Sequence, residues 1–193
     1  MNTRTKLLVA ALFFAGSIST ASASADISNI TASGLGLGTF SWNLSGNNLI
    51  INKTFDSVNP IDLEFTVVHG TGAPGINVTE YITNNTGQDW TDFHFTISGH
   101  DGVEFTDFSG SKLTGFTLEH APISGPTNLN YLGALANGGS TVASFSLSMP
   151  DPGAHGSYTF HLTQVPTIPE PETYAMLLLG LGLIGFTLRN QKS

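Results

Sequence analysis

The fold class of this chain is most evident in the stretch Ile61-Asp62-Leu63-Glu64-Phe65-Thr66-Val67. Apolar and polar side chains alternate strictly along it, and successive side chains of a β-strand point to opposite faces of the sheet. One face of such a strand is apolar and the other polar, so we expect a sheet with a buried inner face and a solvated outer face. The stretch therefore predicts a β-strand.

The same period of two recurs on both sides of this stretch. Before it, Phe40, Trp42 and Leu44 alternate with polar residues, and the turn residues 45–48 lead into a second apolar run at 49–51, which predicts a hairpin. After it, the pattern predicts strands at Ile76–Ile82, Phe93–Ile97, Val103–Phe108, Thr114–Leu118, Thr141–Met149 and Tyr158–Val165. We therefore expect an all-β domain, an antiparallel β-sandwich of Ig-like or jelly-roll-like form, with a small barrel as the alternative.

This β-rich region covers residues 26–167 and has the size of a single domain. It contains two lysines, no arginine and twelve acidic residues, which gives a formal net charge of −10. Such a charge argues against binding nucleic acid or anionic lipid, because both are negative. The chain has no cysteine, so an exported domain of this sequence would depend on side-chain packing rather than on disulfides.

Residues 1–25 have the features of a secretory signal peptide. Arg4 and Lys6 precede an apolar run at 7–15, which is short for a membrane span. Small residues follow, and the A-x-A pattern that signal peptidase cleaves ends at Ala23 and again at Ala25. We expect export by the Sec machinery and cleavage after Ala25. Cleavage after Ala23 and an uncleaved N-terminal anchor are the alternatives.

Residues 168–193 combine three features in order. Pro169-Glu170-Pro171 is an extended acidic motif, because proline holds φ near its polyproline value. The uncharged segment 173–188 follows, and as a helix it reaches roughly 24 Å, close to the ~30 Å of a hydrocarbon core. Arg189 and Lys192 form a basic tail that would lie on the cytoplasmic side of the membrane. We therefore expect a single transmembrane helix at about 173–188.

This tripartite tail resembles the PEP-CTERM sorting signal of Gram-negative bacteria. The likeness covers roughly residues 167–193 and rests on the order of the Pro-Glu-Pro motif, the apolar segment and the basic tail. Tails of that family usually end in consecutive arginines, whereas two uncharged residues separate Arg189 from Lys192 here. The resemblance implies recognition by exosortase, an integral-membrane enzyme. It also implies an association with exopolysaccharide or biofilm production.

Two other kinds of C-terminal tail share the apolar segment. An ordinary single-pass anchor that is never processed is one alternative, although the 16 residues of segment 173–188 are short for a permanent span. A GPI signal is rejected, because no polar spacer of about 8–12 residues precedes the apolar segment.

Motifs that carry chemistry are scarce between residues 26 and 167. None of the six histidines has the i, i+4 spacing of a zinc-binding helix, and the G-x-S-x-G elbow of a serine hydrolase is absent. We therefore expect no catalytic residue, metal or cofactor, and we expect a protein that is not an enzyme. One alternative is a metal site of two or three histidines. Another is a calcium site built from the neighbouring acids Asp89, Asp92, Asp101 and Asp107.

The two tryptophans are the candidates for sugar binding, since flat aromatic rings can stack on sugar faces. Trp42 is in phase with the apolar residues of its strand, so we expect it in the core. Trp90 follows a turn and is out of phase with Phe93 and Phe95. We therefore expect Trp90 to be exposed and to be the candidate ligand contact.

Together these features predict an exported protein that is transiently anchored in the inner membrane and then reaches the cell surface or extracellular matrix. Its expected role is non-catalytic, structural or adhesive, in exopolysaccharide or biofilm. The expected partners are the Sec machinery, signal peptidase, exosortase, the inner membrane and exopolysaccharide, but not nucleic acid. A carbohydrate-binding module for the exopolysaccharide is the alternative function, and an enzyme is the third hypothesis.

Overall fold

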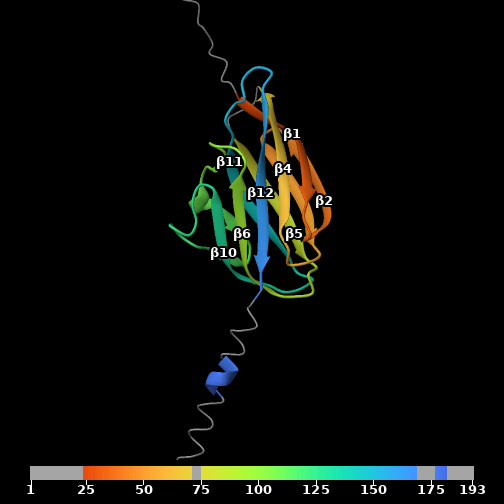
Figure 1. Cartoon of the computed structure of the whole chain (residues 1–193), viewed down its shortest axis with the longest axis vertical. Coiled ribbons are helices and arrows are strands. Elements are labelled where there is room, and N and C mark those ends of the chain that lie inside the picture. Colours follow the sequence, from red (N-terminus) through yellow and green to blue (C-terminus); the bar gives the residue numbers. More distant parts are fainter. Residues whose placement is uncertain (1–23, 71–74, 169–176, 182–193) are drawn as a thin grey trace, which may run out of the picture.

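The computed structural model of the chain describes residues 24–70, 75–168 and 177–181. Two β-sheets face each other across one shared core, as Figure 1 shows. Within residues 24–70 and 75–168 the regular structure consists of twelve strands and one short 3-10 helix. The expectation of an all-β domain is therefore confirmed.

The first sheet, sheet A, has six strands in the order β1-β4-β12-β6-β10-β9, and all of its neighbouring strands are antiparallel. Strand β12 lies near the middle of sheet A and pairs with β4 on one side and β6 on the other (Figure 1). The strands of sheet A are β1 (Ser24–Ser33), β4 (Ile61–Gly70), β6 (Trp90–Ser98), β9 (Phe116–Leu118), β10 (Asn128–Leu135) and β12 (Ser157–Thr167).

The second sheet, sheet B, has the order β2-β3-β5-β11-β7, and β8 also pairs with β11. The strands β3 and β5 pair in parallel, because β4, which connects them in sequence, belongs to the opposite sheet. The expectation of a purely antiparallel sandwich is wrong at this pair. The elements on this side are β2 (Leu37–Ser45), β3 (Asn48–Phe55), β5 (Ile76–Asn84), β7 (Glu104–Phe105), the 3-10 helix η1 (Phe108–Gly110), β8 (Lys112–Leu113) and β11 (Ser140–Ser148).

The alternating stretch in β4 forms the strand that its pattern predicts. Ile61, Leu63, Phe65 and Val67 are completely buried, while the intervening polar residues are only partly covered. Burying each such side chain stabilises the fold by roughly 1.5–3 kcal/mol. The predicted β2–β3 hairpin is also present, and Gly46 in its turn has a φ of +57°, a left-handed conformation that glycine adopts without strain.

Aromatic side chains join the two sheets through the core. The ring of Phe55 in β3 contacts the rings of Trp90 and Phe93 in β6, with centroid distances of 5.3 and 5.6 Å. Phe95 in β6 contacts Phe145 in β11 at 5.4 Å. Each of these pairs crosses from sheet A to sheet B, so the sheets share a single apolar interior rather than two separate ones.

Candidate functional site

The C-terminal end of β12 leads directly into the Pro-Glu-Pro motif. Thr167, the last residue of β12, pairs with Asp92 of β6, and the partly buried Ile168 packs against the core. Pro169, Glu170 and Pro171 follow at once in the sequence but lie outside the described residues, as do the basic residues Arg189 and Lys192. The motif is therefore connected to the central strand of sheet A by one residue.

The predicted transmembrane segment lies largely outside the described residues. Its described part, residues 177–181, is helical, and the four leucines there are 58–70% exposed. Among the residues that the structure describes, no helix has both the length and the apolar character needed to cross a membrane.

The two predicted signal-peptidase positions fall on either side of the start of the described chain. Ala23 lies outside the described residues, whereas Ala25 belongs to β1. Ala25 is 4% exposed and pairs with His69 of β4, next to the pair formed by Ser24 and Gly70. The strand therefore begins two residues before the N-terminus that cleavage after Ala25 would create.

The expected exposure of Trp90 is wrong. Its side chain is completely buried against Phe55 and Phe93, and its ring nitrogen donates a hydrogen bond to Thr86 Oγ1 at 3.2 Å. The inward side chains of β6 change phase between Trp90 and Phe93, where the pairing of β6 with β10 is irregular between Leu132 and Leu135. Trp90 therefore offers no ring surface to a ligand. Trp42 packs against the core as expected, but it is only partly buried.

The histidines do not converge on a common site. His69 lies 2.8 Å from Asp151, His161 lies 2.7 Å from Asp62, and His94 lies 2.6 Å from the amide oxygen of Asn130. Within residues 24–70, 75–168 and 177–181, no three histidines or acids lie close enough together to hold a metal ion. This also applies to the four aspartates considered above; Asp107, for example, caps η1.

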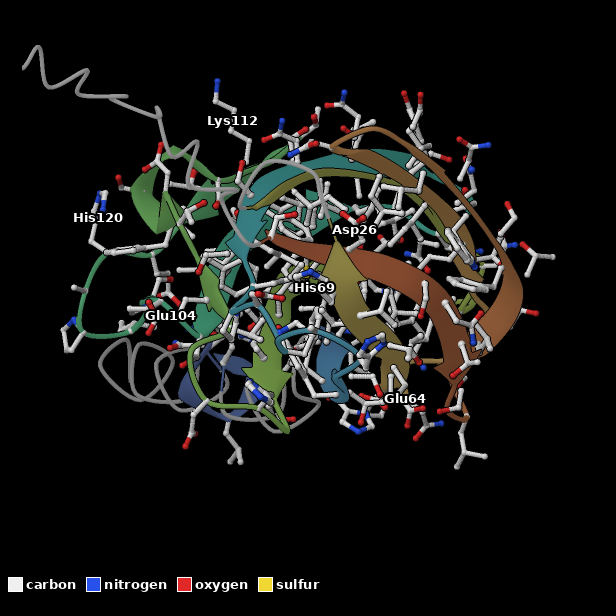
Figure 2. All side chains as sticks on the ribbon, turned by 90° about the horizontal axis from the view of Figure 1, so that it is seen from above. Asp26, Glu64, His69, Glu104, Lys112 and His120 are labelled. Atoms are coloured by element: carbon white, nitrogen blue, oxygen red, sulfur yellow. The ribbon has the colours of Figure 1, made fainter. Side chains whose placement is uncertain are left out.

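A polar cluster that sequence reasoning missed lies inside the core. Lys53 of β3 and Glu80 of β5 extend from sheet B, and Gln164 of β12 meets them from sheet A. The side chains of Lys53 and Glu80 have no exposed surface, and Gln164 is 0% exposed. We call these three residues the buried triad. By contrast Lys112, the other lysine among the described residues, projects away from the sandwich (Figure 2).

The buried triad forms a closed ring of hydrogen bonds. Lys53 Nζ donates to Glu80 Oε2 at 2.5 Å and also to Gln164 Oε1. Gln164 Nε2 donates to Glu80 Oε1 at 3.0 Å. Each of the five polar atoms therefore has a partner within the triad, as burial of polar groups requires. The ring brings an amine, a carboxamide and a carboxyl group into mutual contact, and these are the groups that an acyl transfer between side chains needs.

Burial changes the ionisation of Lys53. Loss of water penalises its ammonium form and lowers the pKa, while the charge of Glu80 and the hydrogen bond to it act in the opposite direction. The net effect is a pKa below the ordinary value for lysine. Lys53 therefore loses its proton more readily than a lysine in water, and the neutral amine that results is the nucleophilic form.

A signal for the buried triad was present in the sequence. Lys53 is in phase with the inward-facing residues of β3, and Glu80 is in phase with those of β5. A charged residue at an inward position of an alternating strand is uncommon unless it is paired, so two such residues together indicate a buried ion pair.

Comparison with known proteins gives one result that concerns the tail. No curated protein and no solved structure matches this chain. The family model described as the PEP-CTERM protein-sorting motif matches residues 167–192, which begin at the last residue of β12. The chain therefore carries a PEP-CTERM protein-sorting motif immediately after its β-domain, in agreement with the resemblance of its tail.

Proposed function

We propose that this is an exported, non-catalytic surface protein whose β-domain is delivered to the cell surface or extracellular matrix by exosortase. The observation that carries this proposal is the sorting motif at residues 167–192. The motif implies processing by exosortase, and a protein processed in this way faces the outside of the cell. Residues 1–25 would direct export through the Sec machinery, and signal peptidase would remove them.

The position of the motif suits recognition by an enzyme in the membrane. Pro169 and Pro171 lack amide hydrogens, and proline favours the extended backbone that an enzyme can bind. In the proposed route, segment 173–188 holds the protein transiently in the inner membrane, with Arg189 and Lys192 on the cytoplasmic side. The domain would then be released or transferred when the tail is removed.

For the β-domain itself we propose a structural or adhesive role in exopolysaccharide or biofilm. The domain is acidic, with two lysines and twelve acidic residues between positions 26 and 167, which argues against a nucleic acid partner. The carbohydrate-binding alternative has lost its candidate residue, because Trp90 is buried.

The test is the intact mass of the protein recovered from the membrane, surface and culture-fluid fractions of its host, because the mass shows whether the tail has been removed. The wild-type protein is expected at the surface or in the medium without residues 173–193. A Pro169→Ala/Pro171→Ala variant is expected to remain in the membrane fraction with its tail intact.

The chain supplies a matched control for this experiment. Pro150-Asp151-Pro152 has the same proline-acid-proline pattern but lies in the connection between β11 and β12. A Pro150→Ala/Pro152→Ala variant should be processed like the wild type. A wild-type protein that keeps residues 173–193 in every fraction, or a Pro169→Ala/Pro171→Ala variant that is processed normally, would contradict the proposal.

A further inference from the structure

We propose that the folded domain forms an intramolecular isopeptide bond between Lys53 Nζ and Gln164 Cδ, with Glu80 transferring the proton. This modification goes beyond the sorting function and does not depend on it. It would link β3 of sheet B covalently to β12 of sheet A, across residues that are 111 positions apart in the sequence.

The first argument is the proximity of the two reacting groups. Lys53 Nζ already contacts the carbonyl oxygen of Gln164, and the carbonyl carbon lies one C=O bond, about 1.2 Å, from that oxygen. Both side chains are fully buried and held by the surrounding strands, so the amine and the amide stay together for as long as the domain is folded. When such a pair reaches the attack geometry, the effective concentration of the amine can be about 10⁵–10⁸ M.

The second argument is the position of Glu80. Its Oε2 contacts Lys53 Nζ, the atom that must lose protons, and its Oε1 contacts Gln164 Nε2, the atom that must leave. One carboxyl group therefore bridges the nucleophile and the leaving group, which is the arrangement that general acid–base catalysis requires. The lowered pKa of Lys53 supports the same chemistry, because it favours transfer of the ammonium proton to Glu80.

The atoms of the reaction balance without any further reagent. The ammonium of Lys53 gives one proton to the Glu80 carboxylate, and the neutral amine attacks Gln164 Cδ. Glu80 then relays a proton from Nζ to Nε2, the Cδ–Nε2 bond breaks, and ammonia leaves. The products are a secondary amide between Nζ and Cδ, ammonia and a protonated Glu80. No oxidant or reductant takes part, and the chain becomes lighter by one ammonia, about 17 Da.

A covalent bond between the sheets would also stabilise a domain that has no disulfide. The chain contains no cysteine, so no disulfide can hold its sheets together outside the cell. The only other lysine between residues 26 and 167, Lys112, is exposed on the short strand β8, away from the buried triad. The arrangement of amine, amide and carboxyl is therefore specific to Lys53.

The proposal is tested by the intact mass of the folded full chain, measured under denaturing conditions and compared with the mass calculated for its observed termini. We expect a deficit of about 17 Da. Proteolysis should then give one cross-linked peptide that joins the segment containing Lys53 to the segment containing Gln164. A Lys112→Met control should keep the deficit, whereas Lys53→Met and Glu80→Gln should show the full calculated mass.

Three results would overturn the proposal. A full mass for the folded wild-type chain would show that the buried triad is only a network of hydrogen bonds. A deficit that persists in Lys53→Met would place the loss elsewhere, for example in a succinimide at Asn137-Gly138, which also releases ammonia. A deficit of about 18 Da with a link from Lys53 to Glu80 would show that the acyl donor is Glu80 and not Gln164. If a variant does not fold, the wild-type mass and its peptide map still decide.

Discussion

Lys53, Glu80 and Gln164 occupy inward positions that most β-sandwiches fill with apolar side chains. Removing one member of such a group leaves polar atoms of the other two buried without a hydrogen bond, and the cost is typically about 3–5 kcal/mol when a charge is left unpaired. The phase of Lys53 and Glu80 on their strands indicates two buried charges, but their contact with Gln164 could not be predicted from the sequence, because the three residues lie on three strands in two sheets. The sorting motif could be predicted, since its residues are contiguous and need no fold to be recognised.

Trp90 belongs to the core, and its removal should show this directly. Trp90→Ala is expected to lower the free energy of unfolding by about 3–5 kcal/mol, because a large cavity forms beside Phe55 and Phe93. Urea denaturation followed by circular dichroism measures the change. Tyr81, which is 48% exposed, provides the matched control, and Tyr81→Ala should change the stability by no more than about 0.5 kcal/mol. Equal losses for the two variants would contradict the prediction.

The contact between His69 and Asp151 should contribute to stability in a pH-dependent way. The hydrogen bond with His69 lowers the pKa of Asp151 below its ordinary value, and the amide of Gly153 acts in the same direction. A carboxyl group whose pKa is lowered by folding stabilises the fold above its unfolded pKa, and this contribution is lost as the pH falls through the folded pKa. Asp151→Asn should therefore remove part of the stability difference between pH 7 and acidic pH.

Urea midpoints at pH 7 and at about pH 3, below the ordinary aspartate pKa, measure this effect. Asp101 is a suitable control, because it is exposed in a turn. The Asp101→Asn variant should keep the acid sensitivity of the wild type. The prediction fails if Asp151→Asn and Asp101→Asn lose stability equally between the two pH values.

At the scale of elements, strands with regular alternation could be predicted from the sequence, whereas strands with irregular pairing could not. The strand β4 was evident from its sequence, whereas β1 and β10 were missed. Register shifts interrupt β1 between Ile27 and Asn29 and β10 between Leu132 and Leu135, so neither strand shows a continuous period of two. The parallel pairing of β3 with β5 was also beyond prediction, since it depends on which sheet β4 joins.

The first two residues of β1 are expected to stabilise the domain. A chain that starts at Ser24 keeps the pairs of Ser24 with Gly70 and of Ala25 with His69, and a chain that starts at Asp26 loses them. Because Ser24 and Ala25 are buried, the longer chain should be more stable by about 1–2 kcal/mol. Urea denaturation of proteins spanning 24–193 and 26–193 measures the difference. Identical midpoints would show that this part of β1 contributes nothing.

At the scale of the whole molecule, the described core ends before the sorting motif. Among residues 24–70, 75–168 and 177–181, the core cluster and the apolar side chains packed against it lie between Ala25 and Ile168. The described leucines of segment 177–181 are largely exposed and belong to no part of that cluster. Folding of the β-domain should therefore be independent of the tail, so that processing can remove the tail without loss of structure.

This independence is tested by ending the chain after Ile168. Urea denaturation should give the shortened protein the same free energy of unfolding as the full chain, to within about 0.5 kcal/mol, which is the usual effect of a surface substitution. A chain ending after His161 is the control, because it lacks the half of β12 that pairs with Phe93 and Phe95, and it should not fold. A large loss of stability in the chain ending at Ile168 would show that the tail takes part in the fold.

The central position of β12 also determines how the domain carries mechanical load. If the protein is attached through the segment that follows Thr167, tension is applied along β12, in the direction of the strand. The hydrogen bonds to β4 and β6 run across the strands, so they are loaded together in shear instead of being opened one after another. An edge strand such as β1, which pairs with β4 alone, would resist the same load with hydrogen bonds on one side only. An attachment made there would therefore load the strand of sheet A that is held by hydrogen bonds on both sides.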